Sequence, residues 1–405
     1  MLKIIKNKTL QTIVSANLFA TLGVSIFNII LLTYAKSFFT SHLFVSIVSI
    51  ALIIPSIFGG MTGKMADQTQ QKTNWLILTK IIQVILYLFL AQIINHKTVF
   101  VFYLVVGINL ISDIIGNYDG NLLTIIIQDR IEDRSRQQTM GLNSAISTLV
   151  EPLGQSVGVF VITQTHNYSL AGLINALTFL VSAICLIVGR RSIATTTRVK
   201  PKRTANGLWP IIQKLMLQTT GMGATSYLGI VMVLNIVVVS FNAILNLLFI
   251  DLAPVLKINY AVAILTINIT YVVGSVWGSV TKKTWIDRLN LFQLLLVTLM
   301  APIIAFSLLL FYPNFYLILL SMFIVSFMSG KMDPKMFATM MPQIDPHMTG
   351  SVFGTISTIV TLGAPIGSTG IIILYNLYGG KIACLCALIL SLASIIWALL
   401  AYRNR

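Results

Sequence analysis

The chain has 405 residues, of which 56% are hydrophobic and only 9% are charged. A soluble protein carries roughly 25% charged residues, so this composition excludes a soluble globular protein. In a soluble protein, the net charge of +16 would suggest a nucleic-acid partner. No nucleic-acid partner is expected here, because the basic residues lie mostly on one side of the predicted membrane, as shown below.

Twelve apolar segments are long enough to cross a bilayer as helices, which need about 20 mostly apolar residues. The expected fold class is therefore an all-α membrane protein with twelve transmembrane helices. In chain order the predicted spans are 13–35, 43–62, 74–94, 98–127, 140–164, 169–189, 224–250, 260–281, 290–311, 315–340, 350–375 and 379–401.

The largest polar interval lies between the sixth and seventh spans. Residues 190–215 carry the basic side chains Arg190, Arg191, Arg198, Lys200, Lys202 and Arg203 and predict a cytoplasmic basic linker. It separates an N-terminal six-helix bundle, 1–189, from a C-terminal six-helix bundle, 216–405. The segment after Trp209 is either a short interfacial helix or part of the linker.

Lysine and arginine are distributed unequally between the two sides of the predicted membrane. If the N-terminus is inside, 20 of the 27 basic residues fall in inside segments and 4 in outside segments. Cytoplasmic loops are enriched in basic residues. The distribution therefore predicts that both termini are cytoplasmic, and it accounts for the positive net charge.

The two predicted halves share a weak internal repeat with an offset of 213 to 215 residues. The matching pairs are Asn28 with Asn242, Gly59 with Gly274, Gly63 with Gly278, Gln128 with Gln343, and Pro152 and Gly154 with Pro365 and Gly367. Their order and nearly constant offset predict two pseudo-symmetric bundles. Such an arrangement is typical of a secondary transporter whose site lies between the halves.

With these features the chain resembles the major facilitator superfamily. After the second span, Gly63, Asp67 and Lys72 occupy the positions of the family's glycine, aspartate and basic residue. Gln68 and Gln70 depart from that motif, which usually has an arginine and a glycine there. The resemblance implies a cytoplasmic loop that acts as a conformational latch, with Asp67 near the start of span eleven and Arg130 or Arg134 as its cation.

In span five, Glu151–Gly154 and Gly158 resemble the glycine–proline motif of the superfamily's antiporters, with Glu151 in place of the first glycine. The segment Gln343–Gly367 resembles the end of span ten and span eleven in the macrolide-efflux-like branch of drug:proton antiporters. They imply proton-driven export of hydrophobic or amphipathic compounds across the cell membrane by alternating access. Proton-coupled uptake of a small metabolite, or a sensor that has kept the fold without transporting, are the alternatives.

Acidic residues within spans are costly and tend to face a cavity or a partner. Asp119, Glu151, Asp113 and Asp333 are therefore the candidates for proton coupling, for which a desolvated carboxylate is required, and Asp119 and Glu151 are the two favoured for it. The alternative is a structural ion pair in which Lys331 or Lys335 neutralises Asp119 or Asp333.

Amide and aromatic side chains in spans one and seven are candidates for the substrate cavity, and the alternative is bonding between helices. The cavity candidates are Asn28, Phe27, Asn235, Asn242, Asn246 and Lys331. In spans five and eleven, prolines at matched positions and the glycines beside them predict hinges or close helix packing. These residues are Pro152, Gly154, Gly158, Pro365 and Gly367.

The sequence contains no nucleotide-binding loop and no motif for a metal or a catalytic triad. We therefore expect a protein that is not an enzyme, with no catalytic residues, no cofactor and no metal site. The expected partners are a small-molecule substrate, protons and the lipid bilayer, and the expected assembly is a monomer.

Overall fold

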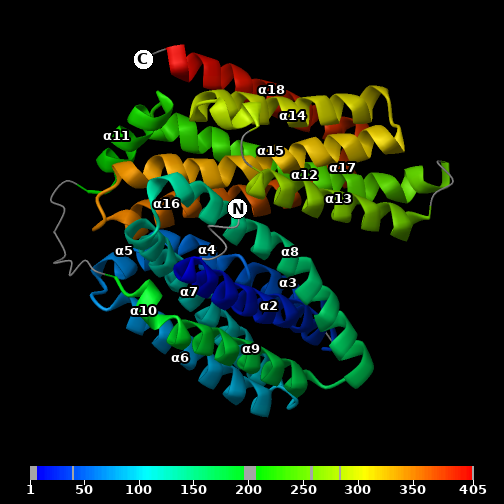
Figure 1. Cartoon of the computed structure of the whole chain (residues 1–405). Coiled ribbons are helices and arrows are strands. Elements are labelled where there is room, and N and C mark those ends of the chain that lie inside the picture. Colours follow the sequence, from blue (N-terminus) through cyan, green and yellow to red (C-terminus); the bar gives the residue numbers. More distant parts are fainter. Residues whose placement is uncertain (1–6, 39–40, 196–206, 256–258, 282–283, 404–405) are drawn as a thin grey trace. The chain divides into compact units, whose positions relative to one another are not determined.

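The computed structural model describes residues 7–38, 41–195, 207–255, 259–281 and 284–403, which contain helices and no strands (Figure 1). The α-helices are α2 (Lys8–Lys36), α3 (Ser41–Ala51), α4 (Ile54–Ile57), α5 (Gly59–Gln68), α6 (Lys72–Ile93), α7 (Val99–Arg130), α8 (Asp133–Thr165), α9 (Tyr168–Val188), α10 (Arg190–Ile193), α11 (Trp209–Thr220), α12 (Ala224–Val255), α13 (Tyr260–Val280), α14 (Leu291–Phe311), α15 (Phe315–Met340), α16 (Thr349–Thr361), α17 (Gly363–Tyr378) and α18 (Gly380–Arg403). Two short 3₁₀ helices are η1 (Trp285–Arg288) and η2 (Met341–Gln343).

Eleven helical segments of the described chain are long and apolar enough to cross a membrane, and a bent pair gives a twelfth. The pair consists of Leu43–Ile57 and Gly59–Gln68, which meet at an angle of 43°. Pro55 and the adjacent glycines 59 and 60 account for the bend, because proline and glycine both weaken helical continuity. The all-α, twelve-span fold expected from the sequence is confirmed.

The chain forms two compact units. The first comprises Met1–Thr139, Ile146–Arg203 and Asp345–Thr355, and the second comprises Met140–Ala145, Thr204–Ile344 and Ile356–Arg405. The linker predicted at 190–215 includes residues 196–206, which lie outside the described residues. After it, the segment from Trp209 onward is helical, as α11.

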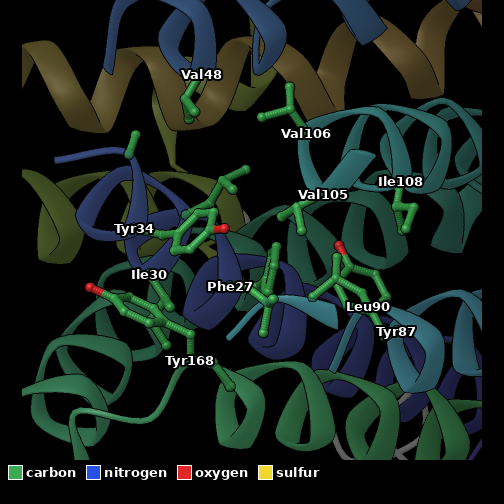
Figure 2. Close-up of a cluster of buried hydrophobic side chains, with 14 of the residues drawn as sticks. Phe27, Ile30, Tyr34, Val48, Tyr87, Leu90, Val105, Val106, Ile108 and Tyr168 are labelled. Carbon is green, nitrogen blue, oxygen red and sulfur yellow. The ribbon is translucent and has the colours of Figure 1, made fainter. Parts of the chain in front are cut away.

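Each unit has its own apolar core. In the first, side chains of α2, α3, α6, α7 and α9 surround Phe27 and Tyr34, as Figure 2 shows. In the second, α12, α13, α14, α15, α17 and α18 enclose Phe241 and Phe306, whose rings meet edge to face at 5.3 Å. The two cores are separate, and each cavity and contact described below lies within one unit.

Local sequence fixes the start of several helices. Asn7, Asn167 and Asn314 accept hydrogen bonds from backbone N–H groups in the first turns of α2, α9 and α15. Asn290 forms a reciprocal capping box with Gln293 at the start of α14. These side chains satisfy donors that a helix start leaves without partners, so the polar turns between spans also define where the spans begin.

Glycines at the matched positions of spans five and eleven lie at close helix contacts. A Cβ added to Gly154 of α8 would come within 2.7 Å of the Ser25 Cβ and 3.1 Å of the Leu22 carbonyl oxygen of α2. One added to Gly367 of α17 would come within 2.6 Å of the Ile236 carbonyl oxygen of α12. Larger residues would force these helices apart, so the repeat preserves a packing contact in each unit.

The helix is continuous at the proline of span five but is interrupted near the proline of span eleven. α8 continues through Pro152, whereas span eleven is divided into α16 and α17 at Leu362, before Pro365. A hinge role for Pro152, Gly154 or Pro365 stays a prediction.

Candidate functional site

A cavity of about 370 Å³ lies inside the first unit. It is bounded by α2, α4, α6, α7 and α9 and is lined by both apolar and polar side chains. The apolar ones include Val24, Leu52, Leu76 and Phe179, and the polar ones include Asn17, Thr21, Asn28, Lys80, Gln83, Asp113, Asn117 and Asp119. The wall can therefore contact a ligand that has both an apolar and a polar region.

A buried ion pair forms one side of this cavity. Lys80 Nζ on α6 lies 2.7 Å from Asp119 Oδ2 on α7, and both side chains are almost completely buried. Thr79 donates a hydrogen bond of 2.6 Å to Asp119 Oδ1, and Lys80 donates one of 2.9 Å to Gln83. Lys80 also lies 5.1 Å from the centre of the Phe179 ring. These partners offset the cost of removing both charges from water.

This pair leads to a stability prediction. Replacing Lys80 by methionine should lower the free energy of unfolding by about 3–5 kcal/mol, because it leaves the Asp119 carboxylate buried without a cation. Adding Asp119→Asn to Lys80→Met should restore part of that loss. Thermal unfolding of the purified single and double variants measures the coupling. Strictly additive effects would show that the two charges do not interact energetically.

Asp113 occupies a different environment on the same cavity wall. Its carboxylate accepts a hydrogen bond of 2.9 Å from Asn109, which in turn accepts one of 2.8 Å from the Tyr87 hydroxyl. Within the described part of the chain, no cation forms an ion pair with it. Since Lys80 and Asp119 neutralise one another, an ionised Asp113 gives the cavity a net charge of −1.

Asn28 supplies a further hydrogen-bond acceptor on the wall of this cavity. Its Oδ1 atom is buried and has no hydrogen-bond partner among the described residues. A buried acceptor without a partner is costly. Together with Asp113, Asn28 therefore suits a ligand that brings hydrogen-bond donors.

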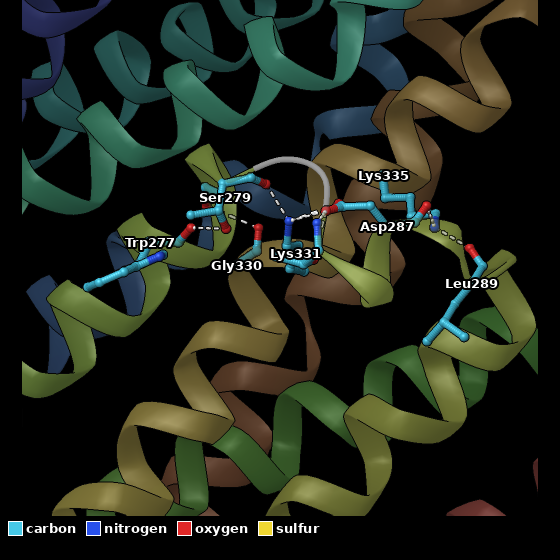
Figure 3. Close-up of polar contacts among 9 residues, drawn as sticks. Trp277, Ser279, Asp287, Leu289, Gly330, Lys331 and Lys335 are labelled. Atoms are coloured by element: carbon cyan, nitrogen blue, oxygen red, sulfur yellow. Dashed lines mark hydrogen bonds and ion pairs between the residues drawn. The ribbon is translucent and has the colours of Figure 1, made fainter. Parts of the chain in front are cut away.

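In the second unit, two lysines of α15 hold the connection between α13 and α14 (Figure 3). Lys331 Nζ lies 2.8 Å from Asp287 Oδ1 and also donates to the carbonyl of Thr281. Lys335 donates to the carbonyls of Asp287, at 2.9 Å, and Leu289. The prediction that Lys331 is a cavity residue is therefore wrong, because its ammonium group is fully engaged here. Nor does Lys331 or Lys335 neutralise Asp119, whose cation is Lys80.

Asp287 belongs to η1, outside the membrane-spanning helices, and its pKa reflects these contacts. Partial burial by itself would raise the pKa, but hydrogen bonds from Lys331 and Thr284 outweigh it and hold the pKa below its usual value of 3.8. The ionised form thus stabilises the folded protein above that value, and this contribution is lost as the pH falls through the lower folded-state pKa.

The lowered pKa of Asp287 leads to a prediction about stability and pH. At neutral pH, Asp287→Asn should lower the unfolding temperature by at least about 3 °C, because Lys331 loses its carboxylate. The difference from the wild type should shrink below about pH 4, where the wild-type carboxyl is also becoming neutral. Thermal unfolding between pH 3 and pH 7 measures it. A difference that stays constant over this range would rule out the ionised carboxylate as the source.

Other predicted cavity residues have different positions. Phe27 is fully buried in the core of the first unit, where its ring meets Tyr87 edge to face at 4.9 Å (Figure 2), so its assignment to the cavity is wrong. In α12, Asn235 donates to the Val231 carbonyl, and Asn246 donates to Asn242 one turn away. These bonds stay within one helix, and a place for the three asparagines in the substrate cavity stays a prediction.

The two remaining acidic candidates are exposed. Glu151 lies on the surface of α8 next to Pro152. Asp333 lies on α15 and interacts electrostatically with Tyr227 of α12. The Tyr227 hydroxyl is buried and has no hydrogen-bond partner in the described chain. Asp333 and Glu151 are therefore not brought together with Asp113 and Asp119 on the wall of the first unit's cavity.

The residues proposed as a latch form a compact group in the first unit. Asp67 accepts hydrogen bonds of 2.7 Å from the backbone N–H groups of both Gly350 and Ser351, in the first turn of α16. A negative charge is favourable at this end of a helix. The Gly63 Cα faces the Gly350 carbonyl so closely that a Cβ there would collide with it.

The basic members of the proposed latch have other partners. Lys72 donates three hydrogen bonds, to the carbonyls of Ala66 (2.9 Å), Asp67 (3.2 Å) and Thr69 (2.7 Å). It therefore holds the C-terminal turn of α5, where a cation is favoured. Arg130 Nε lies 3.9 Å from Asp129. The cation that acts electrostatically on Asp67 is Lys72, rather than the expected Arg130 or Arg134.

Four important polar residues were missed by sequence reasoning: Lys80, Thr79, Gln83 and Asp287. Lys80 had a clear signal, because a lysine in the middle of a span requires a partner. The internal repeat also holds a signal for Asp287. An offset of 215 pairs Lys72 with Asp287, and Gly116 and Gly120 with Lys331 and Lys335. The two halves thus differ in charge at corresponding positions.

Comparison with known proteins relates this geometry to a family and a fold. Residues 13–368 match the profile of the Major Facilitator Superfamily. The structure of the human organic anion transporter TETRAN gives a TM-score of 0.70 at 14% identity and covers 96% of this chain and 99% of that one. A bacterial homologue of the iron transporter ferroportin, in the outward-facing state, gives 0.72 at 12% identity, with 99% and 100% covered.

A proton:xylose symporter bound to 6-bromo-6-deoxy-D-glucose gives a TM-score of 0.63 at 14% identity, with 99% of this chain and 96% of that chain covered. No curated protein matches the sequence significantly. At these identities the solved structures establish a shared fold.

Proposed function

The chain belongs to the major facilitator superfamily of membrane transporters, and from this premise we propose that it exports amphipathic compounds in exchange for protons. The observation that carries the proposal is the cavity of the first unit, where an apolar wall and the carboxylate of Asp113 face the same space. A ligand and a proton can therefore compete for one group, which is the requirement for antiport.

Asp113 is the proton site in this proposal. Its side chain is partly buried in a span and lines the cavity, and among the described residues no cation forms an ion pair with it. Asp119 is paired with Lys80 and fixed by Thr79, so its role is structural. Glu151 is exposed on α8 and has no part in this exchange.

The same geometry supports a cationic amphiphile as the exported compound. Asp113 supplies a negative charge, and Asn28 supplies an acceptor without a partner. A protonated amine satisfies both groups, and its apolar portion can contact Val24, Leu76 and Phe179. Drug-like or macrolide-like export follows from this chemistry and from the motifs of spans five and eleven.

The proposal also includes the location and orientation of the protein. The cell membrane is the location proposed for an exporter, and the unequal distribution of lysine and arginine favours an orientation with both termini in the cytoplasm. A monomer suffices, because the cavity is enclosed by helices of one chain.

Reconstituted vesicles with an imposed pH gradient test the function. With the cytoplasmic face outside and an acidic lumen, ethidium, a permanently charged amphiphile whose amino groups are hydrogen-bond donors, should accumulate in the lumen as protons leave. A one-for-one exchange is electroneutral, so collapsing the membrane potential should not reduce it. Accumulation only when the lumen is alkaline would mean symport and would overturn the export proposal.

The cavity itself is tested by filling it. Gly120 of α7 lines the cavity, and no atom lies within 4 Å of a Cβ added there. Gly120→Leu should weaken substrate binding by about 1–3 kcal/mol through overpacking, without destabilising a helix that gains a better helix former. Gly107→Leu is the matched control, because it also has open space on α7 but does not line the cavity. Equal transport by both variants would argue against the cavity as the substrate site.

A further inference from the structure

A second hollow, of about 810 Å³, lies between α5, α6 and α7 of the first unit. We call it the lateral groove. Its apolar walls are formed by Met61, Met65, Trp75, Ile82, Ile114 and Ile115, and its polar residues are Thr62, Gln68, Thr69, Gln70, Gln71, Thr79 and Tyr118.

The groove is continuous with the apolar surface of the spans. Met61, Met65 and Trp75 are 58%, 49% and 47% exposed. Leu78 and Ile81, further along α6, are also exposed. In a chain that spans a bilayer, such a surface faces acyl chains. The groove therefore opens toward the lipid rather than only toward water.

One end of the groove is polar and lies where the chain leaves the membrane. Gln68 ends α5 and Lys72 begins α6, and the glutamines 70 and 71 lie between them. The connection thus places amides beside thioethers and an indole ring. Methionine adapts to varied apolar shapes, and tryptophan favours the boundary between lipid and water. This combination suits an amphiphile whose polar group stays at that boundary.

The inner wall of the groove is also a wall of the cavity. Thr79 lines the groove and donates its hydroxyl hydrogen bond to Asp119, which lines the cavity. The neighbouring Tyr118 lines the groove too, and its hydroxyl lies 2.6 Å from that of Thr69. A single layer of side chains thus separates the two spaces.

We propose that the lateral groove is a binding site for amphiphiles dissolved in the cytoplasmic leaflet, which loads the transporter from the membrane. This inference rests on the proposed function for its occupant, a cationic amphiphile. The tail lies against Met61, Met65 and Trp75, and the head group lies near the glutamines between α5 and α6. Loading from the leaflet raises the local concentration of substrate beside the cavity.

A heavy-atom quenching experiment tests occupancy of the groove. The full chain is prepared with Trp75 as its single tryptophan, the other four of its five being replaced by phenylalanine. In reconstituted vesicles, (12-bromododecyl)trimethylammonium should quench Trp75 fluorescence saturably, and unbrominated dodecyltrimethylammonium should compete. Quenching that rises in proportion to the probe in the membrane, without saturation or competition, would overturn the proposal.

Groove variants test its role in loading. Met61→Gln together with Met65→Gln should weaken saturable quenching about tenfold, the equivalent of 1.4 kcal/mol, and raise KM for dodecyltrimethylammonium while kcat is kept. Leu78→Gln is the matched control, because Leu78 is exposed on α6 but does not line the groove. An unchanged KM in the double variant would refute loading through the groove.

The two proposals can fail separately. If wild-type vesicles show no proton-driven transport, proton exchange fails, while saturable quenching still supports the groove as a binding site. If transport depends on Asp113 but Trp75 shows no saturable quenching, the groove proposal fails and the function stands.

Discussion

Replacing Asp113 by asparagine is expected to abolish proton-driven accumulation of substrate, with a loss of at least about a hundredfold in uphill transport. Asparagine keeps the shape and the hydrogen bond to Asn109 but cannot take up a proton. The variant should still exchange substrate down its own gradient, at a rate that no longer depends on pH. Uptake into vesicles with and without a pH gradient separates these two activities.

The matched control changes Asp119 instead. Asp119→Asn combined with Lys80→Met removes the neighbouring carboxylate together with its cation, so the net charge of the cavity is kept. Transport by this variant should still depend on the pH gradient, although its folding stability is lower. If the control loses pH dependence and Asp113→Asn retains it, the assignment of the proton site must be reversed.

Replacing Asp67 by asparagine is expected to release the first turn of α16. The carboxylate accepts from two backbone N–H groups, and hydrogen bonds to a charged group contribute about 1.5–3 kcal/mol. Asparagine has only one acceptor atom, and its amide hydrogens would face a donor. The amides of Gly350 and Ser351 should therefore exchange with deuterium at least tenfold faster, as hydrogen-exchange mass spectrometry can measure.

If Asp67 is a conformational latch, as we propose, the same variant should lower kcat while substrate affinity changes little. Asp345→Asn is the control, because Asp345 lies shortly before α16 and caps the exposed turn at His347 without contacting Asp67. A large loss of affinity in Asp67→Asn, with normal exchange at α16, would contradict the latch and indicate a role in the substrate site.

The candidate site illustrates how far sequence patterns reach. The pattern of spans singled out Asp113, Asp119 and Asn28 because polar groups in lipid are costly. It favoured Asp119 over Asp113 as the proton site, whereas the choice depends on which acid has a cation nearby. Lys80 is 39 residues before Asp119, and only the packing of α6 against α7 brings them to 2.7 Å.

Phe27 and Lys331 also show what the sequence does not determine, namely which face of a helix a side chain occupies. Both were predicted to line the substrate cavity, yet a helix has several faces and its rotation follows from packing. Phe27 turns into the core beside Tyr87, and Lys331 turns toward Asp287. Span number alone therefore does not tell which side chains meet a ligand.

By itself, the sequence determined the all-α fold and the twelve spans, because a bilayer imposes length and hydrophobicity on every spanning helix. Resemblance to the family's motif indicated the family and Asp67, and the internal repeat indicated the close-packed glycines. Only the tertiary structure decided which charges are paired, which carboxylate of the cavity has no cation beside it and where the lateral groove lies. These features depend on contacts between residues distant in sequence, and their energies depend on burial that no single span reveals.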